Sequence, residues 1–510
     1  MRDGAAQGDK GEGVTNADGA GAGSTPPAPG GGGAKAAAPA GGGRASAGRS
    51  GGASCADCRM QARMGLLIAA PSSGAGKTSV TLGLLRAFRR RGVAMASAKA
   101  GPDYIDPAFH AAAGGRACVN LDPFAMRPDL LRSLAAAAVA PDGSADDGAA
   151  CGAAGAVAGA EGLVVEGMMG LFDGAADGTG SSADLAALLG LSVVLVVDCA
   201  KQSHSVAALL RGFRDHRADM ALAGVILNRV GSARHAGMLE QAIAPLGLPV
   251  LGVLPADPGL SLPERHLGLV QAMEHADLEG FLGRAADWVS AGLDLSAIRA
   301  LARLRAADAA GPSVPVLAPF GQRIAIARDA AFAFAYPHLV GGWREAGASL
   351  SFFSPLADEA PDADADAVYL PGGYPELHAG RLASATRFTA GIRAAAVRGA
   401  AVYGECGGYM VLGEALEDAH GTRHAMLGLL PLTTSFATRR RHLGYRRAEM
   451  AGFPWEGAIT AHEFHYASIV GEGAAEPLLR ARDAAGTDLG LMGLRVGRVG
   501  GSFLHVIDRA

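Results

Sequence analysis

The stretch from residue 65 to residue 91 constrains the fold of this chain most strongly. Residues 65–70 form a short apolar run, Ser72-Ser-Gly-Ala-Gly-Lys-Thr-Ser79 follows, and residues 80–91 have an amphipathic helical pattern. A strand, a glycine-rich turn and a helix in this order are typical of a phosphate-binding loop, in which backbone N–H groups at the helix start hold phosphates. The sequence therefore predicts a nucleotide site with Mg²⁺ on the Thr78 hydroxyl, formed by Gly74, Gly76, Lys77 and Thr78.

Carboxylates follow the next two expected strands. Lys99-Ala-Gly-Pro-Asp-Tyr-Ile-Asp-Pro107 comes after a strand of small residues, and Glu166 closes the apolar run that begins at Leu163. Glu166 and Asp173 form a second acidic pair. Asp103 and Asp106 could belong to a solvated turn, because Asp and Pro are common turn residues. The ends of such strands face the nucleotide crevice of a parallel sheet, however, so we expect these side chains at the phosphates. Glu166 is a predicted Mg²⁺ ligand, because Mg²⁺ prefers oxygen.

The strand–helix alternation continues beyond these carboxylates. Buried strands are expected at 191–198, 224–228 and 249–255, each a nearly continuous apolar run. Asn228 closes the second of them and is a candidate contact for an adenine base. This pattern predicts a parallel sheet covered by helices, spanning residues 64–287.

Length and composition exclude several classes of protein. The 510 residues exceed one compact core, and a net charge of −4 argues against nucleic acid as a partner. Residues 1–63 are rich in Gly and Ala and are expected to be disordered, with Cys55 and Cys58 incidental rather than zinc ligands. No apolar segment is long enough to cross a membrane, and the six scattered cysteines suggest a reducing cytoplasm.

A second strand–helix alternation starts at Arg323, after a linker expected at 288–322. It contains Val402-Tyr-Gly-Glu-Cys-Gly-Gly-Tyr-Met410, where one cysteine stands between glycines at the change from an apolar run to a helical pattern. We interpret Cys406 as a nucleophile on a sharp strand-to-helix turn, which needs neighbours without Cβ atoms, and we expect the helix start to favour its thiolate. The alternative is a buried structural cysteine.

The motifs together resemble the cobyrinate or hydrogenobyrinate a,c-diamide synthases of cobalamin biosynthesis. The resemblance rests on the phosphate loop and the Lys99–Pro107 stretch, and on Glu-Gly-Met-Met-Gly-Leu-Phe-Asp-Gly174, Leu-Pro-Glu-Arg-His-Leu-Gly-Leu269, Pro-Gly-Gly-Tyr-Pro-Glu376, the Cys406 motif and His-Glu-Phe-His-Tyr466. It covers essentially everything from Met64 onward. It implies a dethiobiotin-synthetase-like ATPase domain followed by a class I glutamine amidotransferase domain at 323–510. Pro71, where the common phosphate loop has its first glycine, fits that relationship.

The resemblance implies that ATP phosphorylates two acetate carboxylates of a corrinoid and that ammonia from L-glutamine displaces the phosphate. Lys99 would stabilise the acyl phosphate, and Asp103, Asp106 and Asp173 would handle substrate and metal. Cys406 would attack glutamine with His505 as its base and the N–H groups of Gly373 and Gly407 as oxyanion donors. Many class I enzymes carry a carboxylate two residues after this base, but here Ile507 occupies that position. His462, Glu463 and His465 are candidates to orient His505, and their spacing does not match a zinc helix.

Other functions remain open from the sequence. A nucleotide switch of the partitioning-ATPase type would use the first domain but leaves residues 323–510 unexplained. Cobyric acid synthase, or an amidotransferase for another modified tetrapyrrole, would share the same machinery. No residue distinguishes a cobalt-containing ring from a metal-free one, and a homodimer is possible.

Overall fold

The computed structural model describes residues 65–140, 159–262, 264–265, 268–269, 271–302 and 314–510. These belong to one compact unit, Met60–Ala510. The tail predicted at 1–63, with Cys55 and Cys58, and most of the low-complexity insert at 141–159 lie outside the described residues. No described helix has the length and apolar character that crossing a membrane requires.

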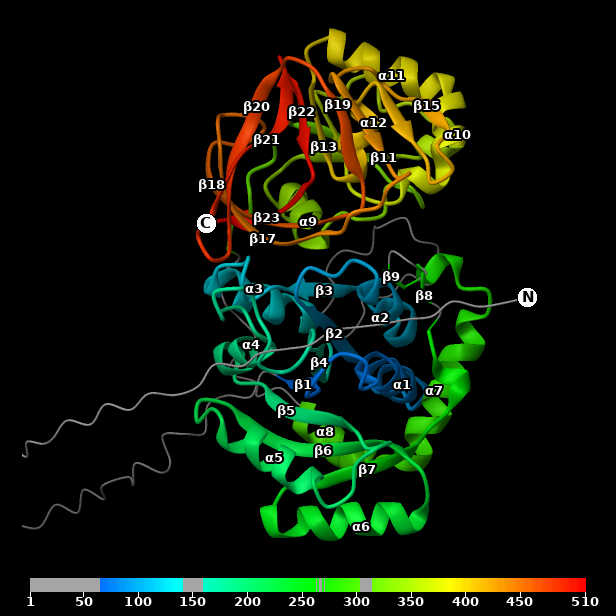
Figure 1. Cartoon of the computed structure of the whole chain (residues 1–510), viewed down its shortest axis with the longest axis vertical. Coiled ribbons are helices and arrows are strands. Elements are labelled where there is room, and N and C mark those ends of the chain that lie inside the picture. The colour runs from blue at the N-terminus through cyan, green and yellow to red at the C-terminus, as the bar shows by residue number, and fades with distance from the viewer. Residues whose placement is uncertain (1–64, 141–158, 263, 266–267, 270, 303–313) are drawn as a thin grey trace, which may run out of the picture. The chain divides into compact units, whose positions relative to one another are not determined.

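The N-terminal part is built on a seven-stranded sheet in the order β3-β2-β4-β1-β5-β6-β7 (Figure 1). All neighbouring strands pair in parallel. The strands are β1 (Leu66–Ala69), β2 (Met95–Ala100), β3 (Cys118–Leu121), β4 (Gly162–Glu166), β5 (Ser192–Asp198), β6 (Ala221–Val230) and β7 (Val250–Pro255). The predicted parallel sheet is therefore confirmed. The order reverses direction on either side of β1, so the loops after β1 and β4 open a crevice at the carboxyl edge.

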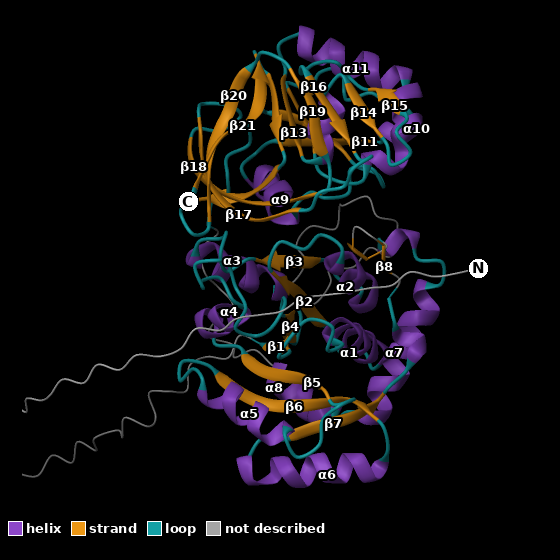
Figure 2. Cartoon of the chain, in the orientation of Figure 1, coloured by secondary structure: helices purple, strands orange, loops and turns teal. Residues whose placement is uncertain are grey.

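Helices cover both faces of this sheet, which explains why its strands are apolar on both sides (Figure 2). Alternate β1 residues enter opposite cores: Leu66 and Ile68 pack with one set of helices, and Leu67 and Ala69 with the other. The first set is α1 (Lys77–Arg90), α2 (Asp106–Gly114), α7 (Leu278–Gly292) and α8 (Leu295–Ala302), and the second is α3 (Pro128–Val139), α4 (Ser182–Leu189), α5 (Val206–Asp215) and α6 (Ala233–Ile243).

The segment predicted as a linker, 288–322, begins inside the N-terminal domain. Its first residues complete α7, and α8 buries Leu295, Ile298 and Ala302 in the core that contains Leu66. The apolar spacing of α8 gives it a packed face, so residues up to 302 are better assigned to the first domain than to a connection. The short strands β8 (Glu264–Arg265) and β9 (Gly268–Leu269) precede it.

The C-terminal part is built on a ten-stranded sheet in the order β11-β10-β12-β13-β22-β21-β20-β17-β18-β23. Strands β10 (Arg323–Ala327), β11 (Ser349–Phe353), β12 (Ala367–Leu370), β13 (Ala401–Glu405) and β22 (Val499–Ser502) are parallel. The others are antiparallel: β17 (His442–Met450), β18 (Gly457–His465), β20 (Glu476–Asp483), β21 (Asp488–Val496) and β23 (Leu504–Arg509). Only Phe503 separates β22 from β23, so the strands between them must curl round to bring both ends together.

Smaller elements complete this part. Helices α9 (Pro337–Glu345), α10 (Ala379–Ser384), α11 (Thr386–Val397) and α12 (Gly407–Leu412) accompany the parallel strands. A four-stranded sheet consists of β14 (Ala415–Glu417), β15 (Arg423–Ala425), β16 (Leu432–Ser435) and β19 (Ser468–Glu472). The second predicted alternation of strand and helix is therefore confirmed, with an antiparallel extension that the sequence analysis did not assign.

Candidate active site

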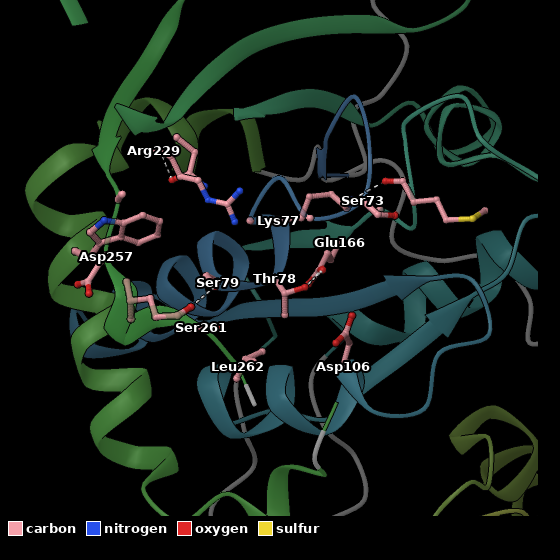
Figure 3. A pocket seen from close by; sticks show the side chains of 18 of the residues that line it. Ser73, Lys77, Thr78, Ser79, Asp106, Glu166, Arg229, Asp257, Ser261 and Leu262 are labelled. Atoms are coloured by element: carbon pink, nitrogen blue, oxygen red, sulfur yellow. Dashed lines mark hydrogen bonds between the residues drawn. The ribbon is translucent and has the colours of Figure 1, made fainter. Parts of the chain in front are cut away.

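The glycine-rich loop after β1 has the backbone of a phosphate-binding loop. Gly74 (φ 80°) and Gly76 (φ 93°) adopt left-handed conformations that other residues rarely adopt, and α1 starts at the next residue, Lys77. The Lys77 ammonium donates to the carbonyl of Met169 at 2.5 Å. The loop lines a cavity of about 690 Å³ together with Thr78, Lys99, Glu166 and other residues (Figure 3). This size and lining suit a nucleotide.

Glu166 is the centre of a buried polar cluster. Its Oε1 accepts hydrogen bonds from the Thr78 hydroxyl at 2.6 Å and from the Lys99 ammonium at 3.1 Å. Its Oε2 lies 2.6 Å from Nε2 of His110. Burial alone would raise the pKa of Glu166, but the charge of Lys99 and the hydrogen bond of His110 lower it. Glu166 is therefore an ionised carboxylate at neutral pH.

Lys99 also pairs with Asp106, at 2.5 Å. The second oxygen of that carboxylate, Oδ1, is buried and has no hydrogen-bond partner among the residues that the structure describes. Burial raises the pKa of Asp106 to about 6, against the opposing charge of Lys99. Asp103 has a local structural task as well, because its Oδ1 accepts the N–H groups of Ile105 and Asp106 at the start of α2. The structure thus brings these predicted residues together with Glu166.

The structure supports the predicted roles of two other residues, Asp173 and Asn228, less directly. Asp173 does not line the nucleotide cavity, and its Oδ2 accepts the N–H of Gly170 at 2.8 Å. Asn228 lines the cavity, but its side-chain amide donates to the carbonyl of Ala75 at 2.8 Å and so holds the phosphate loop. A contact of Asn228 with adenine stays a prediction.

A second cavity, of about 620 Å³, adjoins the first. Lys99 and Asp103 line both cavities, and His505 lines the second. One wall of the second cavity is a face of strands β17, β18 and β23, where cross-strand pairing sets residues of the same face opposite one another. The wall residues from these strands include Leu443, Tyr445, His462, Phe464 and His505.

Cys406 stands on the expected sharp turn between β13 and α12. Its φ of 47° is unusual for a residue with a side chain. A Cβ atom on Gly408 would collide with the carbonyl of Leu370, and one on Gly407 would lie 3.0 Å from the nitrogen of Gly373. The glycines around Cys406 are therefore required by close backbone approach, as the sequence predicted.

The Pro-Gly-Gly loop contacts both His505 and the glycine that follows Cys406. Gly373 lies against Gly407, and a Cβ atom on Gly372 would collide with the ring of His505. The arrangement gathers Cys406, His505 and both predicted oxyanion donors around one loop. The Cys406 sulfur lies 3.7 Å from the carbonyl of Phe464, and the described part of the chain contains no hydrogen bond between the sulfur and His505.

Burial outweighs the expected effect of the helix start on Cys406, where the N–H of Gly407 lowers the pKa of the thiol. Burial, followed by the charge of Glu376, raises the pKa of Cys406 above its ordinary value. α12 has only six residues, so its N-terminus does not offset the loss of water around the sulfur. Burial, with His462 and His465 nearby, lowers the pKa of His505 to about 3, so His505 is a neutral imidazole able to accept a proton.

None of the three candidates to orient His505 places a carboxylate on its ring. Nδ1 of His505 is buried, and no described residue is its hydrogen-bond partner. His462 lies opposite His505 in the strand register. Glu463 instead pairs with Arg446 at 2.6 Å and with His465 at 3.0 Å.

His442, Glu463 and His465 lie close enough to suggest a metal site. The two histidine rings, however, stack in parallel at 4.5 Å and 4°. A metal ion binds in the plane of an imidazole ring, and no point between two parallel rings lies in both planes. The group is better described as a hydrogen-bonded cluster.

Three polar residues of the site were not singled out from the sequence. His110 lies four residues after Asp106 on α2, a spacing that sets both on one helix face and could have indicated it. Glu405 and Glu376 stand inside recognised motifs, but nothing in their spacing distinguished them from neighbouring residues. Their importance depends on contacts between distant segments.

The fold and the two sites define a glutamine-dependent amidotransferase joined to a nucleotide-binding domain. Residues 66–270 match the CobQ/CobB/MinD/ParA nucleotide binding domain, and residues 323–509 match the CobB/CobQ-like glutamine amidotransferase domain. Proteins from Brucella anthropi (62% identity), Brucella melitensis (63%) and Rhizobium meliloti (62%) are similar to this chain over 446 residues, which is 87% of the chain and 98%, 98% and 99% of the relatives. Each is named hydrogenobyrinate a,c-diamide synthase.

The chain belongs to the hydrogenobyrinate a,c-diamide synthase family, so the predicted family is confirmed. It is a glutamine-hydrolysing, amide-forming ligase with an ATP-type nucleotide-binding domain. The alternative of a nucleotide switch is excluded, because such a protein has no use for an amidotransferase domain over 323–509.

Proposed function

We propose that this enzyme converts two acetate carboxylates of hydrogenobyrinate, the metal-free ring, to amides at the expense of ATP and L-glutamine. The observation that carries the proposal is the second cavity, which reaches from Lys99 at the nucleotide site to His505 in the amidotransferase domain. A substrate in this cavity can present a carboxylate to ATP at one end and receive ammonia from the other. The names of the relatives support the metal-free ring over the cobalt-containing one.

The synthetase half would work through an acyl phosphate. A carboxylate oxygen attacks the γ-phosphorus of ATP and ADP leaves, after which ammonia attacks the acyl carbon and phosphate leaves. Lys77 and the N–H groups of the loop bind the phosphates of ATP. Lys99 lines both cavities and stabilises the negative charge that develops on the transferred phosphoryl group.

Mg²⁺ fits the residues of the nucleotide cavity. The Thr78 hydroxyl and the ionised Glu166 carboxylate are oxygen ligands of the kind that this ion prefers, and the unpartnered Oδ1 of Asp106 lies nearby in the same cavity. Thr78 and Glu166 would hold the ion, which neutralises phosphate charge when bound. The carboxylate of Glu166 must then exchange some of its present hydrogen bonds.

The amidotransferase half would release ammonia by covalent catalysis. Cys406 attacks the carboxamide carbon of glutamine and gives its proton to the neutral imidazole of His505, which passes a proton to the leaving ammonia. The nitrogen of Gly373 lies beside Gly407, and the N–H groups of these two residues would donate to the oxyanion. Water then hydrolyses the thioester to glutamate.

The test is to incubate the protein with ATP, Mg²⁺ and glutamine together with either hydrogenobyrinate or its cobalt-containing counterpart, and to weigh the products by mass spectrometry. We expect two successive replacements of a carboxylate OH by NH₂ on the metal-free ring. Amidation of the cobalt ring alone would overturn the choice of ring. Amidation of neither ring would overturn the proposed function.

A further inference from the structure

Glu376 is a half-buried acidic residue that the mechanism above does not use. It follows the Pro-Gly-Gly loop, in a short 3₁₀ turn over Pro375–His378. Its Oε1 is buried and has no hydrogen-bond partner in the part of the chain that the structure describes. A carboxylate oxygen removed from water without a partner is costly, so its retention calls for a partner that is absent from the free protein.

The position of Glu376 connects it with the thiol. The residue before it, Pro375, packs against Gly407, where an added Cβ atom would lie 2.8 Å from the proline ring. Gly407 directly follows Cys406, and Glu376 contributes most after burial to raising the pKa of the thiol. The unpartnered carboxylate therefore lies within electrostatic reach of the nucleophile and beside the predicted oxyanion donors.

The missing partner should be a cation. The charge of Arg439 opposes the effect of burial on the pKa of Glu376, but Oε1 of Glu376 has no hydrogen-bond partner among the described residues. Glutamine carries an α-ammonium group that a short aliphatic chain separates from the carboxamide. When the carboxamide lies at Cys406, that ammonium must lie close by.

We propose that Glu376 binds the α-ammonium group of glutamine and restricts the thiol site to α-amino acid amides. This inference rests on the proposed function, in which glutamine is the ammonia donor. Binding of the ammonium has a second effect, because it neutralises a negative charge that suppresses ionisation of Cys406. The thiol is thus activated when glutamine is bound.

The test compares L-glutamine with glutaramate, which is glutamine without its α-amino group, as substrates for amide hydrolysis. Glu376→Gln keeps the size of the side chain and removes its charge. We expect kcat/KM for glutamine to fall by about 10- to 100-fold, mainly through KM, the range for loss of one charge-assisted hydrogen bond. The value for glutaramate should not fall, so the variant loses selectivity between the two amides.

Controls separate this role from a structural one. Glu476→Gln removes an exposed carboxylate of β20 in the same domain and should leave both values unchanged. Each rate of amide hydrolysis is divided by the rate of ammonium-driven amidation in the same preparation, which corrects for the amount of folded protein. If Glu376→Gln unfolds, the selectivity between glutamine and glutaramate is measured in Glu376→Asp. Equal losses on glutamine and glutaramate, or an unchanged KM for glutamine, would overturn the inference. Failure of the wild-type protein to hydrolyse glutamine would instead overturn the proposed function.

Discussion

Oε1 of Glu405 accepts a hydrogen bond from the backbone N–H of Val506 at 3.2 Å. Glu405 directly precedes Cys406, and Val506 directly follows His505. The other oxygen of Glu405 accepts the hydroxyl of Tyr369 at 2.7 Å. This buried carboxyl therefore fixes the strand of the nucleophile to the strand of its proposed base, although Glu405 touches neither reacting group.

Glu405→Ala should reduce glutamine hydrolysis by about 10-fold or more, because two buried donors lose their acceptor and the strand that carries His505 shifts. Glu405→Gln retains an acceptor oxygen and should keep most of the activity. Glutamate release measures the effect, with ammonium-driven amidation as the check on folding. Full glutaminase activity in the alanine variant would show that the hydrogen bond does not position His505.

Cys406→Ala should lower glutamine-dependent amidation by about 1,000-fold or more, since no other group can form the thioester. Amidation with added ammonium should continue, because that route uses only the nucleotide and substrate cavities. Product masses measured with each nitrogen source give the answer. Loss of both activities in a folded variant would contradict the division of labour between the two sites.

Lys77→Ala should lower amidation by about 100-fold or more with either nitrogen source, because the phosphates lose a fixed positive charge. Some glutaminase activity should remain, since Cys406 lies in the other domain. Phosphate release and glutamate release measured on the same sample separate the two effects. An unchanged rate of synthesis would remove Lys77 from the mechanism.

The rate of glutamine hydrolysis should depend on the ionisation of Glu376. Burial raises its pKa to about 7, so below this pH the carboxyl is protonated and cannot pair with an ammonium group. We expect kcat/KM for glutamine to fall as the pH drops below about 7, whereas His505, with its pKa lowered by burial to about 3, stays neutral. This fall in kcat/KM below about pH 7 should be absent when glutaramate is the substrate.

Burial also raises the pKa of Glu405 to about 7, so Glu376→Gln tells the two carboxyl groups apart. If kcat/KM for glutamine still falls below about pH 7 in Glu376→Gln, the titrating group is Glu405 and the assignment to Glu376 is wrong.

Asp122 should make the enzyme less stable as the pH rises from about 4 to about 6. Its carboxylate is fully buried, accepts the N–H groups of Phe124 and Ala125 and lies 3.1 Å from the Tyr445 hydroxyl. Burial raises its pKa to about 6, so within this range the folded protein binds more protons than the unfolded chain. Unfolding is therefore favoured as the pH rises, by up to about 3 kcal/mol from this group.

Asp122→Asn removes this titration. From pH 4.5 to pH 7 the wild type should lose stability through Asp122 that the variant does not lose. The thermal unfolding midpoint of the variant relative to the wild type should therefore be higher at pH 7 than at pH 4.5. Equal pH dependence in both proteins would mean that the Asp122 carboxyl has the same pKa in the folded and the unfolded chain, and would contradict the prediction.

The sequence by itself determined the features that local geometry enforces. Gly76-Lys77-Thr78 after a strand requires a left-handed turn into a helix, and Cys406 between glycines requires close backbone approach. Both depend on residues within a few positions of each other, so their spacing predicted them. The same holds for the parallel sheet, whose strands are apolar on both faces.

Only the tertiary structure decided how distant groups act on one another. It brings His110 to Glu166, leaves Oε1 of Glu376 without a hydrogen-bond partner among the described residues, and sets Lys99 in the lining of two cavities. It also raises the pKa of Cys406, because desolvation by the whole fold outweighs one short helix. Burial and electrostatic fields are sums over segments far apart in the chain, and no local pattern records those sums.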